Sequence, residues 1–369
     1  MKFATKTKGI GGKIKQRISD FKVTEIPPKK RKLHEEVEQR TQKENHLVFW
    51  MEKFNWDTSG ALLMISNKAN IPVDRFYFAG TKDKRAITKQ RVSVLYSEEM
   101  EQSLKHLNIC DIKLNNFSRG KKLNLGESEG NEFEIIIRNI TLDKDEIEKR
   151  IKSVFTELEK GIPNIFGPQR FGETRPVTYP VGKQLVLGNP EEAAKIYLTQ
   201  IFPKESKDAK KAREFLAKHW NRKGFLKALE IFPDRLRYER MIINQLTYRP
   251  TDFAGAFSIL PKKLLKLFPN AVQSWIFNRA IKKIDTTRVK QESEIPMVGF
   301  DTIFGNNDLS GLIKKIMRDE GIKKSDFNLK IFSHIRCSGG FRRILLRLEN
   351  PEILEISEDK FNKGKIQET

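Results

Sequence analysis

A change of hydrophobic pattern along the 369-residue chain constrains the fold more than any other feature of the sequence. Up to about residue 173, strand-like alternation and helix-like periodicity succeed one another. From there to residue 325 the pattern is almost entirely helical, and strand-like runs return between residues 326 and 357. This order predicts an α+β fold with a mixed, largely antiparallel sheet, into which a mainly helical α/β domain is inserted. The expected domains are 1–173 with 326–369, and 174–325.

Two neighbouring segments show these patterns most clearly. In NEFEIIIRNI, Phe133, Ile135 and Ile137 fall on one face of a strand, because successive side chains of a strand point to opposite faces. The next segment repeats apolar residues at helical spacing, and Gly161 ends it, as glycine often does after a helix. Upstream, Asp57 begins an Asp-Thr cap in front of another apolar-periodic segment, so a helix is expected there as well.

The chain is strongly basic, with 70 lysines and arginines against 48 aspartates and glutamates, a formal net charge of +22. A field of this sign attracts polyanions. Acidic residues are interspersed with the basic ones, as in DKDEIEKR, which indicates a folded basic protein rather than a disordered tail. A charged surface kept only for solubility is the alternative. Because solubility does not need so large an excess of one sign, nucleic acid is the favoured partner.

The sequence argues against a membrane protein, a secreted protein and a metal site. No apolar run approaches the length of a membrane span, and the basic amino terminus lacks the apolar stretch of a signal peptide, so a cytoplasmic protein is expected. Cys110 and Cys337 lie far apart without a CxxC or Cys/His cluster, which predicts neither a disulfide framework nor a zinc site. The basic run Lys29–Lys32 matches a simple nuclear-import signal, but a loop that faces RNA is the preferred interpretation.

One acidic residue lies in a basic turn after a predicted strand. The neighbours of Asp83 are Lys82, Lys84, Arg85, Lys89 and Arg91. Neighbouring cations favour the charged form of a carboxylate, and a loop position leaves it able to reach a substrate. The alternative is that Asp83 only caps a turn or pairs with one of these lysines, and residue type alone favours that alternative.

The segment around this aspartate resembles a known family. GTKDKRAITKQ, residues 80–90, is similar to the signature of the TruD family of tRNA pseudouridine synthases. Four further blocks agree with that family in the same order: KIKQRISDFKVTEI, ENHLVFWMEKFNWDT, GNEF and GIPNIFGPQRFG. NAVQSWIFNRAI and PMVGFDT are weaker similarities in the predicted inserted domain, and nothing is carried over onto residues 185–255. The resemblance covers nearly the whole chain, and the compact length favours an archaeal-type member.

The resemblance implies that the chain isomerises a uridine in tRNA, with position 13 expected, and that Asp83 is the catalytic carboxylate. It implies a discontinuous pseudouridine synthase catalytic domain, 1–173 with 326–369, and an inserted TRUD domain, 174–325. The isomerisation breaks the bond from N1 to C1′ and forms one from C5 to C1′ with no atom gained or lost, so no cofactor is expected. A carboxylate nucleophile can attack either C1′ or C6, and the sequence leaves both open.

The same resemblance implies which residues surround the substrate. Lys15 is the expected cation beside Asp83, and Glu25 is expected to position that lysine unless it is only an exposed strand residue. Phe133 is expected to stack on the flipped uracil, the alternative being an ordinary core phenylalanine. Asn131 would face the same side of the strand as Phe133 and bond to the uracil edge or to the Asp83 loop.

Four more residues complete the expected substrate site: Lys82, Gln90, Gln169 and Arg170. The first two belong to the signature around the catalytic aspartate. The other two are the polar residues of GPQRFG, whose flanking glycines predict a tight loop at the rim of the active site, with Phe166 and Phe171 packed.

A catalytic tRNA pseudouridine synthase that binds tRNA as a monomer, without a metal, is therefore the favoured interpretation. A non-catalytic RNA-binding protein on the same scaffold is the first alternative, but the presence of Asp83, Asn131 and Phe133 argues against it. A methyltransferase would need a glycine-rich turn after its first strand, and none lies in a convincing context. A basic structural protein of the ribosome or of chromatin would explain the charge but not the motifs.

Overall fold

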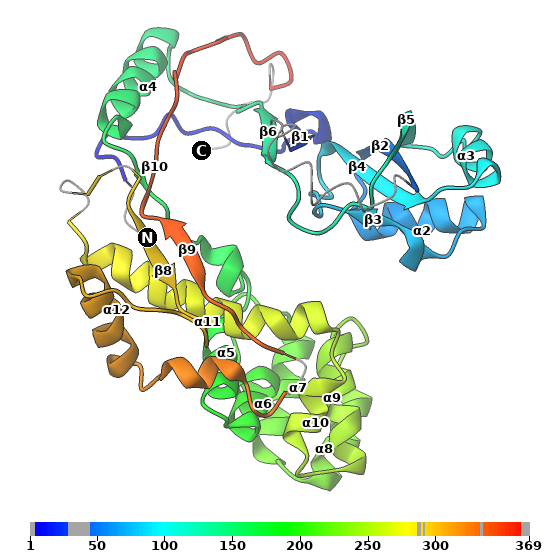
Figure 1. The fold of residues 1–369 in the computed structure, drawn as a ribbon, viewed down its shortest axis with the longest axis vertical. Helices are drawn as coiled ribbons and strands as arrows, with labels where there is room; N and C mark the ends of the chain where they lie inside the picture. Colours follow the sequence, from blue (N-terminus) through cyan, green and yellow to red (C-terminus); the bar gives the residue numbers. More distant parts are fainter. Residues whose placement is uncertain (1–3, 29–44, 286–288, 291, 333–334, 363–369) are drawn as a thin grey trace. The chain divides into compact units, whose positions relative to one another are not determined.

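The computed structural model describes residues 4–28, 45–285, 289–290, 292–332 and 335–362 of the chain. They form two compact units (Figure 1). Each unit has a hydrophobic core of its own. The sheet unit comprises Thr7–Lys152 and Ile353–Thr369, and the helical unit comprises Met1–Lys6 and Ser153–Glu352. The basic run Lys29–Lys32, for which a loop facing RNA is expected, lies outside the described residues.

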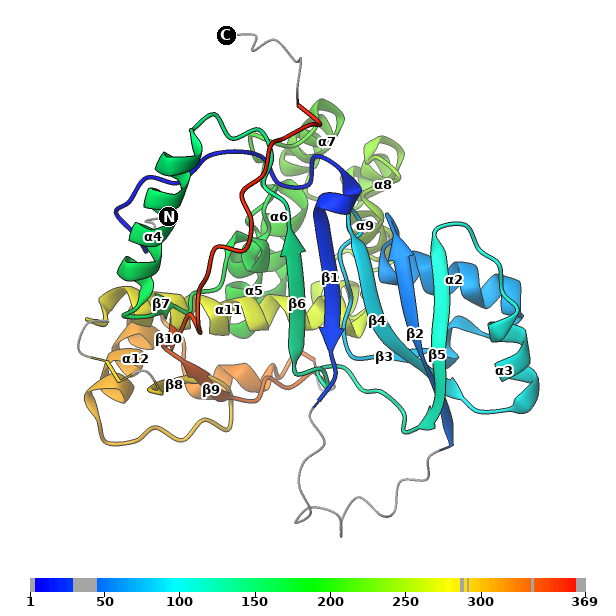
Figure 2. The same ribbon diagram turned by 90° about the horizontal axis from the view of Figure 1, so that it is seen from above.

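One six-stranded sheet forms the sheet unit. Its strands are β1 (Phe21–Ile26), β2 (His46–Phe54), β3 (Tyr77–Phe78), β4 (Ile87–Leu95), β5 (Ile112–Gly120) and β6 (Gly130–Ile135). The order across the sheet is β5-β2-β4-β1-β6, as Figure 2 shows, and β3 also pairs with β4. The pair β1 and β4 is parallel, whereas the other pairs are antiparallel. The α+β fold with a mixed, largely antiparallel sheet is therefore confirmed.

Helices complete the sheet unit. They are the α-helices α2 (Thr58–Ala69) and α3 (Glu98–Lys105), the first part of α4 (Lys144–Leu158), which crosses the boundary at 152/153, and the short 3-10 helices η1 (Ile18–Asp20) and η2 (Val73–Arg75). The predicted cap of α2 is confirmed, because Asp57 Oδ1 accepts a hydrogen bond from Gly60 N at 2.9 Å. Leu62 and Ile65 of α2 pack into one core with Phe49 and Val92 of the sheet.

The helical unit has the predicted helical pattern. Its α-helices are α5 (Thr178–Val186), α6 (Pro190–Thr199), α7 (Lys207–Lys218), α8 (Arg222–Ile231), α9 (Arg237–Tyr248), α10 (Phe253–Ser258), α11 (Lys262–Lys283) and α12 (Asp308–Asp319). It also contains η3 (Pro168–Phe171), η5 (Lys324–Asn328) and the short strands β7 (Ile162–Pro163), β8 (Glu294–Met297), β9 (Gly340–Arg343) and β10 (Leu345–Leu346). The helix α5 packs closely on α11, because a Cβ atom at Gly182 would lie only 2.1 Å from the carbonyl oxygen of Phe268.

From the sequence, residues 326–357 are expected to supply the last strands of the α+β domain. These strands do not extend the main sheet, so this part of the prediction is wrong. β9 pairs with β8, and β10 pairs with β7, in two separate two-stranded sheets. Phe327, Phe332 and Ile344 are buried in the core of the helical unit. Alternation along a strand indicates that one face is buried, but it carries no information about which partner strand buries it. By compactness the units divide at 152/153 and 352/353, whereas the expected domain boundaries, drawn on hydrophobic pattern, lie at 173/174 and 325/326.

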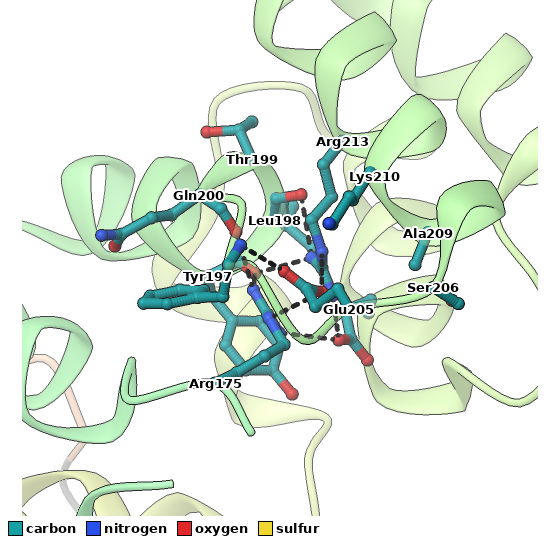
Figure 3. Close-up of polar contacts among 12 residues, drawn as sticks. Arg175, Tyr197, Leu198, Thr199, Gln200, Glu205, Ser206, Ala209, Lys210 and Arg213 are labelled. Atoms are coloured by element: carbon teal, nitrogen blue, oxygen red, sulfur yellow. Dashed lines mark hydrogen bonds and ion pairs between the residues drawn. The ribbon is translucent and has the colours of Figure 1, made fainter. Parts of the chain in front are cut away.

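A buried cluster of four charged side chains ties the end of α6 to two other helices (Figure 3). Arg213 of α7 is fully buried and pairs with Glu205 and with Glu239 of α9, each at 2.8 Å. Arg213 also donates two hydrogen bonds to carbonyl oxygens in the last turn of α6, and Arg175 pairs with the same two glutamates. The two arginines thus satisfy carbonyl groups that a helix end leaves without partners, and the two carboxylates balance their charge.

Within the described residues, no helix has both the length and the apolar character that a membrane span needs. Cys110 is exposed and Cys337 is buried, and both are free thiols.

Candidate active site

Asp83 lies in the loop between β3 and β4, and buried polar residues hold this loop in place. The side-chain amide of Gln90 donates to the carbonyl oxygen of Gly80 at 3.0 Å. Thr58 Oγ1, at the start of α2, accepts from the backbone N–H of Lys82 at 2.9 Å and donates to Gln90 Oε1 at 2.9 Å. The first turn of α2 and the strand β4 therefore fix the backbone that leads into Asp83.

Lys53 holds the same loop from the strand β2. Its ammonium group donates to the carbonyl oxygen of Asp83 at 2.9 Å and also to that of Trp56. The residue is 1% exposed, and this burial lowers the pKa of Lys53 from its ordinary value to about 8. The charges of Asp57 and Asp83 raise this pKa and that of Lys82 lowers it further, but burial is the largest effect.

The sequence prediction missed Lys53, although the sequence contains a signal for it. From Leu47 onward the buried positions of β2 alternate, and they are Leu47, Phe49, Met51 and Lys53. A lysine at an inward position of an otherwise apolar alternation must find buried acceptors, because an unpaired buried ammonium group is costly. The two carbonyl groups of the Asp83 loop and of Trp56 are those acceptors.

Lys15 and Asp83 form an ion pair, with Lys15 Nζ 3.1 Å from Asp83 Oδ2. The Asp83 side chain is 47% exposed, so one side of the carboxylate stays open to solvent. Lys15 adopts a positive φ of 57°, and Arg85 donates to its carbonyl oxygen at 3.0 Å and to that of Gln16 at 3.1 Å. The guanidinium group of Arg85 thus ties the segment that carries Lys15 to the loop that carries Asp83.

Two phenylalanines continue from this ion pair along the sheet. Lys15 Nζ lies 3.9 Å from the centre of the Phe21 ring, a favourable contact between a cation and an aromatic face. The Phe21 ring meets the Phe133 ring edge to face, with 5.9 Å between their centres. Phe133 is 55% exposed, so it is not a core residue. The Phe133 ring offers an open apolar surface on the same side of the sheet as Phe21.

Asn131 and Phe133 lie on the same face of the edge strand β6, as expected from their spacing. In the register of β1 and β6, Asn131 is opposite Glu25 and Phe133 is opposite Val23. Asn131 is exposed and can therefore reach a ligand placed over this face.

Glu25 does not hold Lys15, which corrects the expected role of this glutamate. It is buried rather than exposed, and its carboxylate pairs with Arg91 Nε at 3.0 Å and with Lys82 Nζ at 3.6 Å. The register of β1 places Glu25 at the strand end where these two cations converge, and Lys15 instead pairs with Asp83. Glu25 thus stabilises the base of the signature loop.

Two other predicted substrate contacts are also turned inward. Gln90 is fully buried and its amide bonds to Thr58 and Gly80, whereas the Lys82 side chain is 5% exposed and paired with Glu25. Both residues support the loop of Asp83 rather than present a polar group at the surface.

Gln169 and Arg170 belong to η3 in the helical unit, so their expected place beside the active site stays a prediction. The tight loop expected for GPQRFG is present. It depends on Gly172, where φ is +96° and a Cβ atom would lie 2.0 Å from the carbonyl oxygen of Arg175. Gln169 is exposed and Arg170 lies over the ring of Phe166.

The described residues include no cluster of three or more His, Cys, Asp or Glu side chains that could hold a metal ion. What the sheet unit does bring together is the open carboxylate of Asp83, the ammonium group of Lys15 and, through Phe21, the exposed ring of Phe133. Asn131 adds an amide on the strand face that carries Phe133. This set can hold a flat polar ring and attack it or the group attached to it.

Comparison with known proteins identifies the family of the chain. A family model described as tRNA pseudouridine synthase D (TruD) matches residues 1–292. The chain is 32% identical over 410 residues to a Methanosarcina acetivorans protein named "Probable tRNA pseudouridine synthase D", a match that covers 98% of this chain and 89% of the relative. A Methanopyrus kandleri protein of the same name is 34% identical over 327 residues, 85% of this chain and 80% of the relative.

The fold also matches a solved structure. The crystal structure of a Methanosarcina mazei protein described as "Putative tRNA pseudouridine synthase D (TruD)" superimposes with a TM-score of 0.71 and 29% identity, covering 94% of this chain and 87% of that one. The archaeal type of these relatives agrees with the expectation from the sequence.

Proposed function

Because the chain belongs to the TruD family of tRNA pseudouridine synthases, we propose that it converts one uridine of tRNA to pseudouridine, with Asp83 as the catalytic carboxylate. The observation that carries the assignment is the ion pair of Asp83 with Lys15 on a loop anchored by buried polar groups. A carboxylate that served only to cap a turn would be turned toward the backbone N–H groups of that turn. Asp83 instead has an open side and a cation beside it.

The chemistry needs a carboxylate, a surface for the base and no external reagent. The bond from N1 to C1′ breaks, the uracil turns over, and C5 bonds to C1′ while the proton lost from C5 is balanced by one gained at N1. Asp83 can form the covalent intermediate at C1′ or at C6, and Lys15 compensates its charge in the free enzyme. Phe133 is the surface on which the flipped base stacks, and Asn131 supplies an amide for its polar edge.

The substrate that we propose is tRNA, with the uridine at position 13 as the target. The net charge of +22 supports a polyanionic substrate, and the family supports tRNA. We further propose that the chain acts as a monomer in the cytoplasm and that it needs neither a metal ion nor a small-molecule cofactor.

A direct test is to incubate the purified chain with unmodified tRNA transcripts in the presence of a chelator and to map pseudouridine at nucleotide resolution. We expect one modified position, at nucleotide 13. Asp83→Asn should give no product while tRNA affinity stays within a few-fold of the unmodified protein, because one charge adds little to an interface with many phosphates. Asp74→Asn, at an exposed aspartate of the same unit, is the matched control and should remain active. Turnover by the Asp83 variant near the normal rate would refute the assignment.

A further inference from the structure

Two arginines from distant parts of the helical unit share one aromatic ring. The guanidinium carbon of Arg342, on β9, lies 4.1 Å from the centre of the Phe166 ring, and that of Arg170, on η3, lies 5.0 Å from the same centre. Each contact is favourable by itself, because a cation is attracted to the face of an aromatic ring. Together they bring two positive charges close to each other.

The surrounding structure fixes this arrangement. Phe166 is clamped by the side chain of Asn278, which accepts from its backbone N–H at 2.8 Å and donates to its carbonyl oxygen at 2.9 Å. Asn164 accepts a hydrogen bond from Arg342 Nη2 at 2.5 Å and donates to the carbonyl oxygen of Arg343 at 3.0 Å. Phe166 and Arg342 are thus held by hydrogen bonds, and Arg170 lies over the ring that they fix.

Within the described part of the chain, no carboxylate balances their charges. Among the residues that the structure describes, no aspartate or glutamate forms an ion pair with Arg170 or Arg342. Burial lowers the pKa of Arg342 from its ordinary value, and the positive charge of Arg170 lowers it further. The helical unit elsewhere pairs its buried arginines with carboxylates, as Arg213 does with Glu205 and Glu239. The unbalanced pair is therefore an exception within its own unit.

We propose that Arg170 and Arg342 together bind one phosphate group of the RNA substrate. This inference rests on the proposed function, because it names how the helical unit contacts the RNA. A phosphodiester carries one negative charge and accepts two parallel hydrogen bonds from a guanidinium group, which Arg170 can supply. Arg342 donates to Asn164 through Nε and Nη2, so it adds its positive charge and its Nη1 donors to the same site. The five N–H donors of Arg170 have no side-chain or backbone acceptor among the described residues, so they are available to such a group.

The pair thereby gives Arg170 a specific role. From the sequence, Arg170 is expected to be one polar residue of a substrate rim, and the contribution of Arg342 is not expected at all. Arg342 follows Phe341 in GGFRR, in a segment whose alternation indicates only a strand. The pairing of β7 with β10, together with Asn164, is what brings it to Phe166.

The test measures the affinity of the chain for an unmodified tRNA transcript at several salt concentrations. Arg170→Gln and Arg342→Gln should each weaken binding by about tenfold at moderate salt, the loss expected for one charge-assisted contact. Each should also make the plot of log affinity against log salt concentration less steep, by about the slope that one phosphate contact contributes. Both side chains bind the same phosphate, so losing either one should already release it. The double variant should therefore bind tRNA with nearly the same affinity as whichever single variant binds less tightly.

Two further variants keep the test informative. Arg342→Lys retains the charge and loses the planar fork, so it should fold normally and still weaken binding, though less than Arg342→Gln. Arg237→Gln is the matched control, because Arg237 is an exposed arginine of the same unit that lies 4.7 Å from the ring of Tyr238. It should bind tRNA within twofold of the unmodified protein.

The outcomes separate this inference from the proposed function. Unchanged affinity and salt slope in folded Arg170→Gln and Arg342→Gln would overturn the phosphate site while leaving turnover by the unmodified chain untouched. If the wild-type protein binds a transcript but forms no pseudouridine in it, the proposed function is refuted. The salt dependence of tRNA binding by the variants would still decide whether the phosphate site exists. Strictly additive losses in the double variant would show two separate contacts and would overturn the shared phosphate.

Discussion

Lys15 Nζ lies 3.1 Å from Asp83 Oδ2, although 68 positions separate the two residues along the chain. The fold brings them together because Arg85, two residues after Asp83, bonds to the backbone of Lys15 and Gln16. The ion pair of Lys15 and Asp83 is therefore supported by hydrogen bonds from the Arg85 side chain to the backbone. It gives the carboxylate a fixed cation on one side and leaves the other side open.

Lys15→Met should lower turnover by about a hundredfold, a loss typical of one preorganised charge in an active site. Affinity for tRNA should change by no more than a few-fold, because many other basic residues contribute to binding. Single-turnover rates and equilibrium binding, measured side by side, separate the two effects. Lys13→Met, at an exposed lysine of the same segment, is the control and should keep its rate. Equal losses of turnover rate in Lys15→Met and Lys13→Met would show that Lys15 acts only through the overall positive charge of the protein.

Phe133→Ala should slow turnover strongly and cost little stability, because the side chain is 55% exposed and the flipped uracil would lose its stacking surface. Phe133→Tyr should keep much of the activity, since it retains the ring face. Phe49→Ala provides the comparison, because Phe49 is fully buried and its loss should cost about 3 to 5 kcal/mol. Thermal melting and single-turnover rates check both points. An Ala variant that melts as low as Phe49→Ala but turns over normally when folded would place Phe133 in the core.

Local signals in the sequence predicted those parts of the structure that depend on local interactions. The cap at Asp57, the helix that ends before Gly161 and the shared face of Asn131 and Phe133 are each determined by a few neighbouring residues. The mixed sheet followed from the same patterns. The prediction that Lys15 lies beside Asp83 came from resemblance to a family, and nothing local in the sequence indicates it.

The features that the sequence did not predict depend on pairing between distant segments. The sequence pattern predicts strands at β9 and β10. Only the three-dimensional fold determines that β9 pairs with β8 and that β10 pairs with β7. Glu25 was expected near Lys15, yet the strand register carries it to Arg91 and Lys82. Lys53 continues the apolar alternation of β2, but its acceptors, the carbonyl oxygens of Trp56 and Asp83, are brought to it only by the fold.

Arg213→Ala should destabilise the helical unit by about 3 to 5 kcal/mol, because it leaves Glu205 and Glu239 buried with one cation fewer. It also removes two hydrogen bonds from the end of α6. Arg235→Ala is the matched control. Arg235 forms an ion pair with Asp208 in which both side chains are about half exposed, and such pairs contribute less than about 1 kcal/mol. Urea unfolding measures both changes, and similar small losses in the two variants would show that the buried cluster contributes little.

Lys53→Met should change how stability depends on pH. The pKa of Lys53 is about 8 in the folded protein, below its ordinary value of 10.5, which it regains on unfolding. Below pH 8 both states bind the proton, so this lysine gives no slope. Between pH 8 and 10.5 the unfolded state binds more protons than the folded state, and therefore the contribution of Lys53 to the free energy of unfolding rises with pH.

Urea unfolding at pH 7, 8.5 and 9.5 tests this sign. The unmodified protein should gain stability relative to Lys53→Met as the pH rises through this range, because the variant lacks the group that releases its proton on folding. Lys149→Met, at an exposed lysine of α4, should follow the unmodified protein at every pH. Parallel curves for the unmodified protein and Lys53→Met would mean that the folded Lys53 keeps its proton across this range. Lys53 would then hold the Asp83 loop as a charged ammonium group. The charges of Asp57 and Asp83, which raise its pKa, would outweigh the effect of burial, which lowers it.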